Sequence, residues 1–228
     1  MCLIVYSPTG VLVERAIFDH AQRINPDGLG VMSRNGVQKF VGKTARKRAW
    51  RYVRQLAASR VPYGIHFRFA THGSVTRENC HPFYAPNSDA IVMHNGVIDL
   101  TATAATSLRS DTSLFVEEFM SGAPGPEDSS YERYYRCLGS TIGIWNTLLV
   151  FHSLTEAFTV CNEPWGEWIG DHWYSNTYSL PWNVEAGMAG ITYPGLQGDW
   201  GDDFVPDEFD DWRMSYPRFG DERYREES

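Results

Sequence analysis

Long apolar runs are missing from this sequence of 228 residues. No stretch reaches the roughly 18 consecutive apolar residues that a membrane-spanning helix needs. The first residues also lack the basic stretch and the apolar segment of a secretory signal. We therefore expect a cytoplasmic protein without membrane contact.

Cysteine is scarce, and its spacing follows no metal-binding pattern. The four cysteines, Cys2, Cys80, Cys137 and Cys161, form no Cys-x-x-Cys pair and match no zinc-ligand spacing. This pattern favours free thiols in a reducing compartment. We expect Cys2 to be reactive and the other three to be packed.

Internal repeats, nucleotide-binding loops and a recognisable sugar-phosphate domain are also absent from the sequence. With 43% hydrophobic and 14% aromatic residues, the chain can bury a substantial core. We expect one domain over residues 1–197 and an acidic, aromatic-containing tail over residues 198–228.

Charge is distributed unevenly along the chain. The tail holds eleven acidic residues against four arginines, and the whole chain has a formal charge of −8. A predicted helix over residues 44–59 lies in a stretch that carries basic residues and no acid. Three alternatives stay open: the tail docks on this helix, within the chain or across a homo-oligomer; the helix contacts nucleic acid; or the face and the tail are simply solvated.

The hydrophobic pattern predicts a mixed α/β protein. Strands are expected at residues 3–6, 10–13, 36–42, 64–70, 90–93, 141–152 and 157–161, with a further strand and turn within 170–177. Helices are expected at 44–59 and 113–119. Residues 121–130, with two prolines and two glycines, are expected to form a loop.

Cys2 directly follows the initiator Met1. Once Met1 is removed, as the small second residue favours, the thiol lies beside the free α-amino group of the same residue. An α-amine has a pKa of about 8 and can take the thiol proton near neutrality. Cys2 is therefore a candidate nucleophile with its own base, although a second-position cysteine alone is a weak signal.

Several downstream segments occur in an order that strengthens this interpretation. They are residues 25–31 (NPDGLGV), 64–73 (GIHFRFATHG), 79–83 (NCHPF), 91–98 (IVMHNGVI) and 109–112 (RSDT). Together with Cys2, over roughly residues 2–195, they resemble the glutaminase domain of class II glutamine amidotransferases, such as that of glucosamine phosphate synthase. These domains are N-terminal nucleophile hydrolases.

The resemblance implies a four-layer αββα sandwich and hydrolysis of L-glutamine to glutamate and ammonia without a metal or organic cofactor. It implies that Cys2 forms a thioester, and that Asn95 and Gly96 form the oxyanion hole. Oxyanion donors are worth about 3–4 kcal/mol in hydrolases. It also implies that Arg68 binds the α-carboxylate of glutamine with help from the two residues Thr71 and His72, and that Asp111 pairs with the α-ammonium.

Several of these residues have simpler interpretations. Asn95 and Gly96 are also typical of a hairpin turn. Asp111 could be only the N-cap of the following helix, with Ser110 as the rival cap. His72 and His94 are treated as structural histidines without a proton-transfer role. Arg68, in an apolar strand, should have an anionic partner because burying a lone guanidinium is costly.

The chain departs from the family pattern after the nucleophile, where Leu3 replaces the usual glycine. With a single predicted domain, it would need a separate ammonia-accepting synthase subunit or act alone. Two alternatives remain: an N-terminal nucleophile amidase acting on another γ-glutamyl or acyl amide, and a non-catalytic interaction protein that retains the fold.

Overall fold

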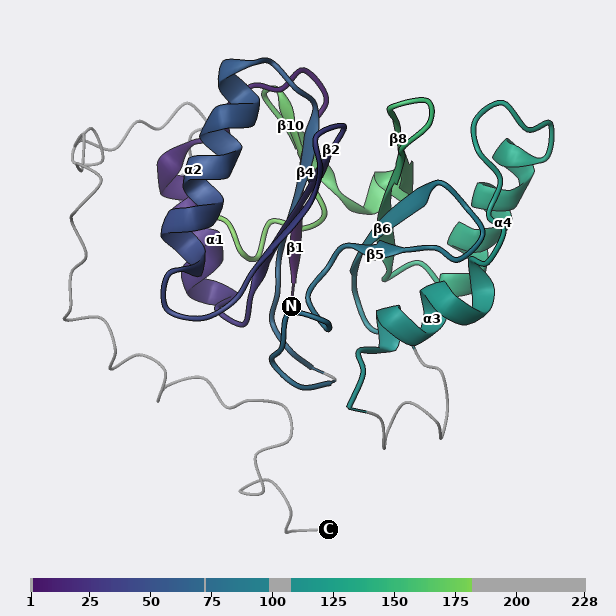
Figure 1. The fold of residues 1–228 in the computed structure, drawn as a ribbon, viewed down its shortest axis with the longest axis horizontal. Helices are drawn as coiled ribbons and strands as arrows, with labels where there is room; N and C mark the ends of the chain where they lie inside the picture. The colour runs from purple at the N-terminus through teal and green to yellow at the C-terminus, as the bar shows by residue number, and fades with distance from the viewer. Residues whose placement is uncertain (1, 72, 99–107, 182–228) are drawn as a thin grey trace, which may run out of the picture.

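The computed structural model describes residues 2–71, 73–98 and 108–181. Figure 1 shows two β-sheets that face each other, with helices on their outer faces. The strands are β1 Leu3–Ser7, β2 Leu29–Ser33, β3 Gly36–Phe40, β4 Tyr63–Phe67, β5 Phe83–Tyr84, β6 Ala90–Asn95, β7 Thr147–His152, β8 Ala157–Cys161, β9 Glu167–Ile169 and β10 His172–Tyr174. The helices are α1 Arg15–Ile24, α2 Ala45–Ala58, α3 Asp111–Phe119, α4 Tyr131–Ile142 and a short 3₁₀ helix at Glu163–Trp165.

Both sheets are antiparallel. The first has the strand order β3-β2-β4-β1-β10-β9, and the second has the order β5-β6-β7-β8. The registers place Leu3 opposite Phe67 in the first sheet and Asn95 opposite Thr147 in the second. The α/β class expected from the sequence is therefore confirmed as a mixture of helices and antiparallel sheets.

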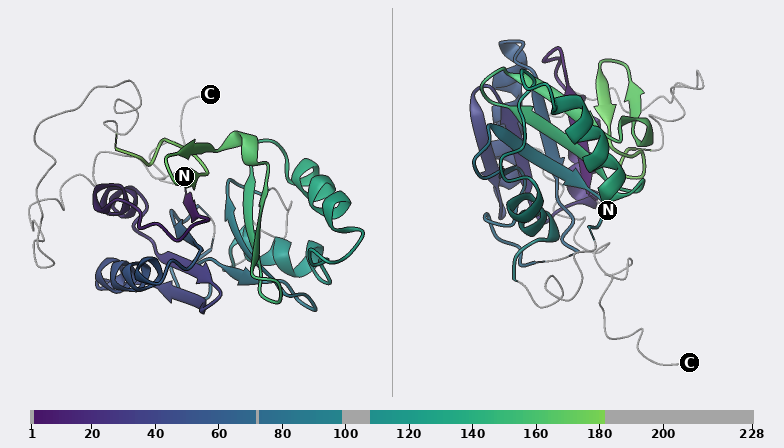
Figure 2. Two further views of the ribbon diagram at one scale, coloured as in Figure 1. Left: turned by 90° about the horizontal axis from the view of Figure 1, so that it is seen from above. Right: turned by 90° about the vertical axis from the view of Figure 1, so that its right-hand side faces the viewer.

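Three hydrophobic clusters hold these layers together. Leu3 and Val5 of β1 face α1 and α2, whereas Ile4 faces the second sheet, because successive side chains of a strand point to opposite sides. Residues of β6 and β7 pack in the same way on α3 and α4. The view from above in Figure 2 shows the two sheets between the two helix pairs.

The basic helix forms where it was expected. α2 buries Ala49, Val53 and Leu56 on one face. Arg46 on its polar face lies 3.5 Å from Asp19 of α1, and the guanidinium of Arg48 lies over the Phe40 ring. Part of the basic surface is thus used within the fold. The tail lies outside the described residues, so its docking stays a prediction.

Some boundaries differ from the sequence prediction. Residues 10–13 form no strand, because the Val11 carbonyl accepts side-chain donors from Ser7, Tyr63 and His172 instead of a strand partner. The strand expected at 141–152 begins at Thr147, since residues 141 and 142 complete the last turn of α4. The strand expected at 64–70 ends at Phe67. The loop at 121–130 is confirmed, whereas α1 and α4 were not predicted.

All four cysteines are free thiols, as expected. Cys80 and Cys161 are buried, but Cys137 is exposed on α4, which corrects the expectation that it is packed. Within the described ranges, no helix is both long and apolar enough to cross a membrane.

Candidate active site

Cys2 lies at the start of β1, near the centre of the first sheet, and is partly buried. Its Sγ accepts the Phe69 backbone N–H at 3.4 Å. The Asn176 side chain donates to the Cys2 carbonyl at 2.8 Å, and the backbone N–H of Ile4 donates to Ser175 Oγ at 2.9 Å. The turn after β10 therefore fixes the first residues of the chain.

The electrostatic surroundings of Cys2 link it to two predicted site residues. Burial raises the pKa of the Cys2 thiol, and Asp111 also raises it, while the Phe69 N–H and the charge of Arg68 lower it. The fold thus brings Cys2, Arg68 and Asp111 into one region from β1, the end of β4 and the start of α3. Because burial is the largest influence, the thiol is protonated at neutral pH and needs a base to react.

Arg68 follows β4 and is only 2% exposed. Its backbone is held on both sides, since its N–H donates to the Gly28 carbonyl at 2.8 Å and its carbonyl accepts from Asp27 at 3.0 Å. A carboxylate oxygen of Asp27 also accepts the Ala70 N–H at 2.9 Å. One guanidinium nitrogen of Arg68 donates to the Ser74 carbonyl at 3.2 Å. The turn before β2 therefore sets the position of this arginine.

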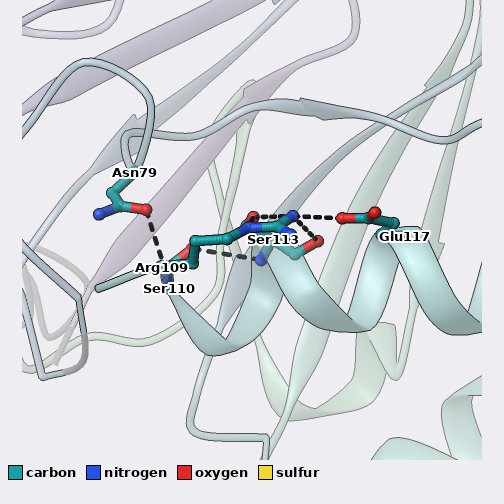
Figure 3. Close-up of polar contacts among 5 residues, drawn as sticks. All are labelled: Asn79, Arg109, Ser110, Ser113 and Glu117. Atoms are coloured by element: carbon teal, nitrogen blue, oxygen red, sulfur yellow. Dashed lines mark hydrogen bonds and ion pairs between the residues drawn. The ribbon is translucent and has the colours of Figure 1, made fainter. Parts of the chain in front are cut away.

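Asn79 connects the loop beyond Arg68 to the start of α3. Its side-chain nitrogen donates to the carbonyls of Ser74, at 3.1 Å, and Leu108, at 2.6 Å. Its Oδ1 accepts the Ser110 backbone N–H at 3.0 Å (Figure 3). Figure 3 also shows Arg109 reaching along α3 to Ser113 and Glu117. The buried Asn79 amide thus joins the two segments that carry Arg68 and Asp111, alongside the Ser74 N–H, which donates to the Leu108 carbonyl at 3.1 Å.

Asp111 is the first residue of α3, and Ser110 is its N-cap, with Ser110 Oγ accepting the Ser113 N–H at 3.2 Å. The alternative that Asp111 is the cap is therefore wrong. The Asp111 carboxylate is 6% exposed and accepts the backbone N–H groups of Ile98, at 3.0 Å, and Thr112, at 2.8 Å. These bonds hold the carboxylate in a fixed orientation.

Asn95 and Gly96 lie at the end of β6. The hairpin alternative is wrong, because β6 pairs with β7 across a long connection that includes α3 and α4. Gly96 has φ +134°, and a Cβ at this position would lie 2.1 Å from Asn146 Oδ1. Only glycine fits at this position without strain or a clash. Thr71 is exposed in the bend after β4, and His72 lies outside the described residues.

Three histidines form a buried cluster beside these residues. His66 Nε2 lies 2.9 Å from the His94 carbonyl, and the rings of His66 and His81 are 3.9 Å apart. His94 contacts Thr112 Oγ1 at 2.9 Å and Asn146 Oδ1 at 2.8 Å. Burial lowers the pKa of all three, to about 3 for His66. They are therefore neutral at pH 7 and act as packing and hydrogen-bonding groups.

Sequence reasoning assigned no role to Asn79, Asn146 or Asn176, although Asn79 and Asn176 lie in segments that it singled out. Their importance comes from contacts with residues distant in the sequence, for which there is no local signal. Among the described residues, no group of three or more His, Cys, Asp or Glu side chains is arranged to hold a metal ion.

Comparison with known proteins gives two partial matches. The chain is 48% identical over 46 residues, 20% of its length, to a glutamine–fructose-6-phosphate aminotransferase of Halobacterium salinarum. It is 30% identical over 145 residues, 59% of its length, to the protein of the same name from Mycobacterium leprae. No family model matches the chain.

The matched parts cover 8% and 23% of these two relatives, so the chain spans less than a quarter of the length of either. The similarity therefore concerns a part of each relative. It shows that this chain contains a domain related to glutamine amidotransferases.

Proposed function

We propose that the chain is a glutaminase of the class II type, which hydrolyses L-glutamine through a thioester on Cys2. The observation that carries this proposal is a chain of contacts from Cys2 to Asp111. Cys2 Sγ accepts the N–H of Phe69, which follows Arg68, and Arg68 and Asn79 share the Ser74 carbonyl. Asn79 in turn binds the N–H of Ser110, which precedes Asp111. A nucleophile with one buried cation and one buried anion nearby suits an amide substrate that carries both an α-carboxylate and an α-ammonium.

Each of the two charged residues would bind the oppositely charged α-group of glutamine. The guanidinium of Arg68 would hold the α-carboxylate, with the two residues Thr71 and His72 contributing hydrogen bonds. Asp111 would hold the α-ammonium, for which both carboxylate oxygens keep acceptor capacity beyond their backbone bonds. This double recognition would select free glutamine over glutamine within a peptide.

The chemical step would begin at the free α-amine that removal of Met1 exposes. The Cys2 thiol would give its proton to this amine and attack the side-chain carbonyl of glutamine. The side-chain amide of Asn95 and the backbone N–H of Gly96 would stabilise the oxyanion. The protonated amine would then give its proton to the departing ammonia, and water would hydrolyse the thioester to glutamate by the reverse route.

The fold supports the same family type. Two antiparallel sheets packed between helix pairs match the αββα sandwich expected of N-terminal nucleophile hydrolases, with the nucleophile at the start of a central strand. We propose that residues 1–197 form the glutaminase domain and that residues 198–228 are an acidic tail. Deletion of 198–228 distinguishes the alternatives for the tail: a solvated tail leaves the melting temperature and oligomeric state unchanged, whereas a docked tail does not. A separate synthase subunit would consume the ammonia. A cytoplasmic location stays a prediction.

A second candidate is an amidase that acts on another γ-glutamyl amide. A cavity of about 350 Å³ beside Asn95 leaves room for a larger amide substrate. The loss of activity on replacing Arg68 or Asp111 distinguishes the two candidates. Both residues should be essential for hydrolysis of free glutamine and less important for a substrate with blocked α-groups.

Intact mass before and after incubation with a glutamine-like diazoketone tests the proposal. We expect the active protein to lack Met1 and to gain one adduct on Cys2, and Cys2→Ala to gain none and to form no glutamate. A protein that retains Met1 and still hydrolyses glutamine, or a Cys2→Ala variant with full activity, would contradict the mechanism. Persistence of the biological effect in Cys2→Ala would favour a non-catalytic interaction protein.

A further inference from the structure

Cys2 and Asn95 lie at the ends of two strands, β1 and β6, and each of these strands has a different neighbouring strand on either side. In the first sheet β1 lies between β4, which leads to Arg68, and β10, which leads to Asn176. In the second sheet β6 lies between β5 and β7. Arg68 and Asp111 occupy the β4 and β5 side of the nucleophile. The β10 and β7 side holds none of the charged residues proposed to bind glutamine, and is unused in that sense.

A cavity of about 350 Å³ lies on this unused side. Its described lining comes from the end of β6, the start of β7, the loop before β7, the 3₁₀ helix with β9, and the turn after β10. Asn95 belongs to this lining, and Asn176, which also lines it, donates to the Cys2 carbonyl. The cavity is therefore adjacent to the proposed oxyanion hole and to the residue that carries the thioester.

Three residues of the cavity lining carry a buried oxygen that has no hydrogen-bond partner in the described part of the chain. Asn95 Oδ1, Thr147 Oγ1 and Asn176 Oδ1 are buried and accept no hydrogen bond within the described part of the chain. Their residues are 5%, 2% and 8% exposed. Buried polar groups are nearly always hydrogen-bonded, and an unmet one costs about 1–3 kcal/mol. Because the oxygens themselves are inaccessible, a donating ligand in the cavity reaches them only when these side chains turn toward it.

Two tryptophan side chains and one acidic side chain lie at the rim of the cavity. Trp145 and Trp165 are 77% and 47% exposed, and their rings lie 5.3 Å apart. Glu167 is the only charged side chain among the described lining residues. Exposed tryptophans favour a planar apolar body and attract cations through their ring faces. Glu167 likewise favours a positive ligand.

Building on the proposed function, we propose that this cavity binds a primary amine with an aromatic body, which accepts the γ-glutamyl group from Cys2. The uncharged amine nitrogen attacks the thioester carbonyl, so that a C–N bond forms and the C–S bond breaks. The electron pair of the C–S bond leaves on sulfur, and the proton lost by the amine passes through the Cys2 α-amine to the thiolate. The complete reaction converts glutamine and the amine into a γ-glutamylamide and ammonia, without an oxidant or reductant.

Competition between water and two amines tests this transfer. Full-length protein with free Cys2 is incubated with glutamine and either phenethylamine or propylamine, and the ratio of γ-glutamylamide to glutamate is measured by mass spectrometry. The two amines share the reacting group and differ in the ring. We expect a ratio at least tenfold higher for phenethylamine, and a fall of about tenfold in Trp145→Ala and Trp165→Ala. The matched control Trp168→Ala alters an exposed tryptophan outside the cavity lining and should leave the ratio unchanged.

Calorimetric titration of Cys2→Ala with the same amines provides a readout that needs no turnover. Binding of phenethylamine in preference to propylamine, weakened by Trp165→Ala and not by Trp168→Ala, supports the cavity. If the two amines bind equally, or if neither binds, the proposal is overturned. This is the result expected when the tryptophans contact a protein partner instead of an amine. If the amine binds but glutamate is the sole product, the transfer is overturned and the glutaminase function is retained. If the amine binds but neither glutamate nor γ-glutamylamide forms, the proposed glutaminase function is wrong, and the transfer is overturned with it.

Discussion

The side-chain oxygen of Asn79 accepts the backbone N–H of Ser110 at 3.0 Å, and this bond joins the loop after β4 to the helix that begins with Asp111. Asn79 is 5% exposed, and its nitrogen donates to the carbonyl of Ser74, which also accepts from Arg68. The segments that carry the two charged residues proposed to bind the substrate are therefore joined by this uncharged side chain, together with the bond from the Ser74 N–H to the Leu108 carbonyl.

Replacing Asn79 with alanine should weaken substrate binding more than it alters the nucleophile. Asn79→Ala leaves the Ser110 N–H without its partner and removes one of the donors to the Leu108 carbonyl, which keeps the Ser74 N–H. The start of α3 can then shift relative to Arg68. We expect KM for glutamine to rise about tenfold, while the rate of Cys2 alkylation by iodoacetamide changes less than twofold.

Glu117→Gln is the matched control, because it removes the exposed ion pair with Arg109 on the same helix, and such pairs contribute little. It should leave both measurements unchanged. An unchanged KM in Asn79→Ala would show that the two segments hold their positions without this bond.

Asp111→Asn should impair the reaction with free glutamine selectively. The substitution keeps the shape of the side chain but removes the charge that would pair with the α-ammonium. Loss of one partner of a buried charge pair costs roughly 2–5 kcal/mol, so kcat/KM for glutamine should fall by about 30-fold or more. With N-acetylglutamine, which has no ammonium, we expect a change below about threefold. Equal losses for both substrates would favour a structural role for Asp111.

Gly96→Ala should reduce both activity and stability. A non-glycine residue at φ +134° is strained by about 1–3 kcal/mol, and the added Cβ would meet Asn146. The resulting shift moves a proposed oxyanion donor, so kcat should fall by about 10²–10³-fold.

Gly125→Ala provides the control for Gly96→Ala. Its new Cβ would meet no atom closer than Asp89 Oδ1 at 3.5 Å, so kcat and the urea midpoint should stay as in the parent. If Gly96→Ala hydrolyses glutamine at the parental rate, Gly96 is not part of the oxyanion hole.

The buried histidines should make the fold sensitive to acid. His66 has a pKa of about 3, and burial lowers the pKa of His81 well below its ordinary value. Below about pH 6.5 the unfolded chain binds protons that the native chain does not, so stability falls as the pH is lowered from about 6.5 toward 3. Each such histidine contributes a slope of up to about 1.4 kcal/mol per pH unit in this range.

Urea unfolding of His81→Phe at pH 7 and pH 5 measures this contribution. The substitution removes two ring nitrogens that have no partner within the described residues and keeps an aromatic ring. We expect a smaller loss of stability between the two pH values than in the parent. His20→Gln, which alters a half-buried histidine, should change the loss less. If His81→Phe loses as much stability between pH 7 and pH 5 as the parent, groups other than His81 cause the acid sensitivity.

The sequence predicted the elements whose burial pattern is local. β1, β6, β8 and α2 were found because their apolar residues repeat with the period of one face or fill a short buried run. Both α1 and α4 were missed. In α4 the β-branched pair Thr141 and Ile142 is typical of a strand, yet Ile142 packs in the helix on the same cluster as Leu138.

The candidate site divides in a similar way. Its seven proposed residues came from short segments that resemble a known family, and their roles remain predictions. The residues that position them could not be inferred, because Asn176 contacts Cys2 across 174 positions and Asn79 contacts Ser110 across 31. Such pairs are determined by the order of strands in the sheets, which no local pattern encodes.

The contact between Asn176 and Cys2 bears on when the protein matures during its synthesis. The first strand is completed by the last, since Ile4 and Cys2 are held by the two residues that follow β10. A growing chain can already pair β1 with β4 once residue 67 has been added, but it still lacks these two contacts. The proposed nucleophile therefore gains its last anchoring bonds only when residue 176 has been added.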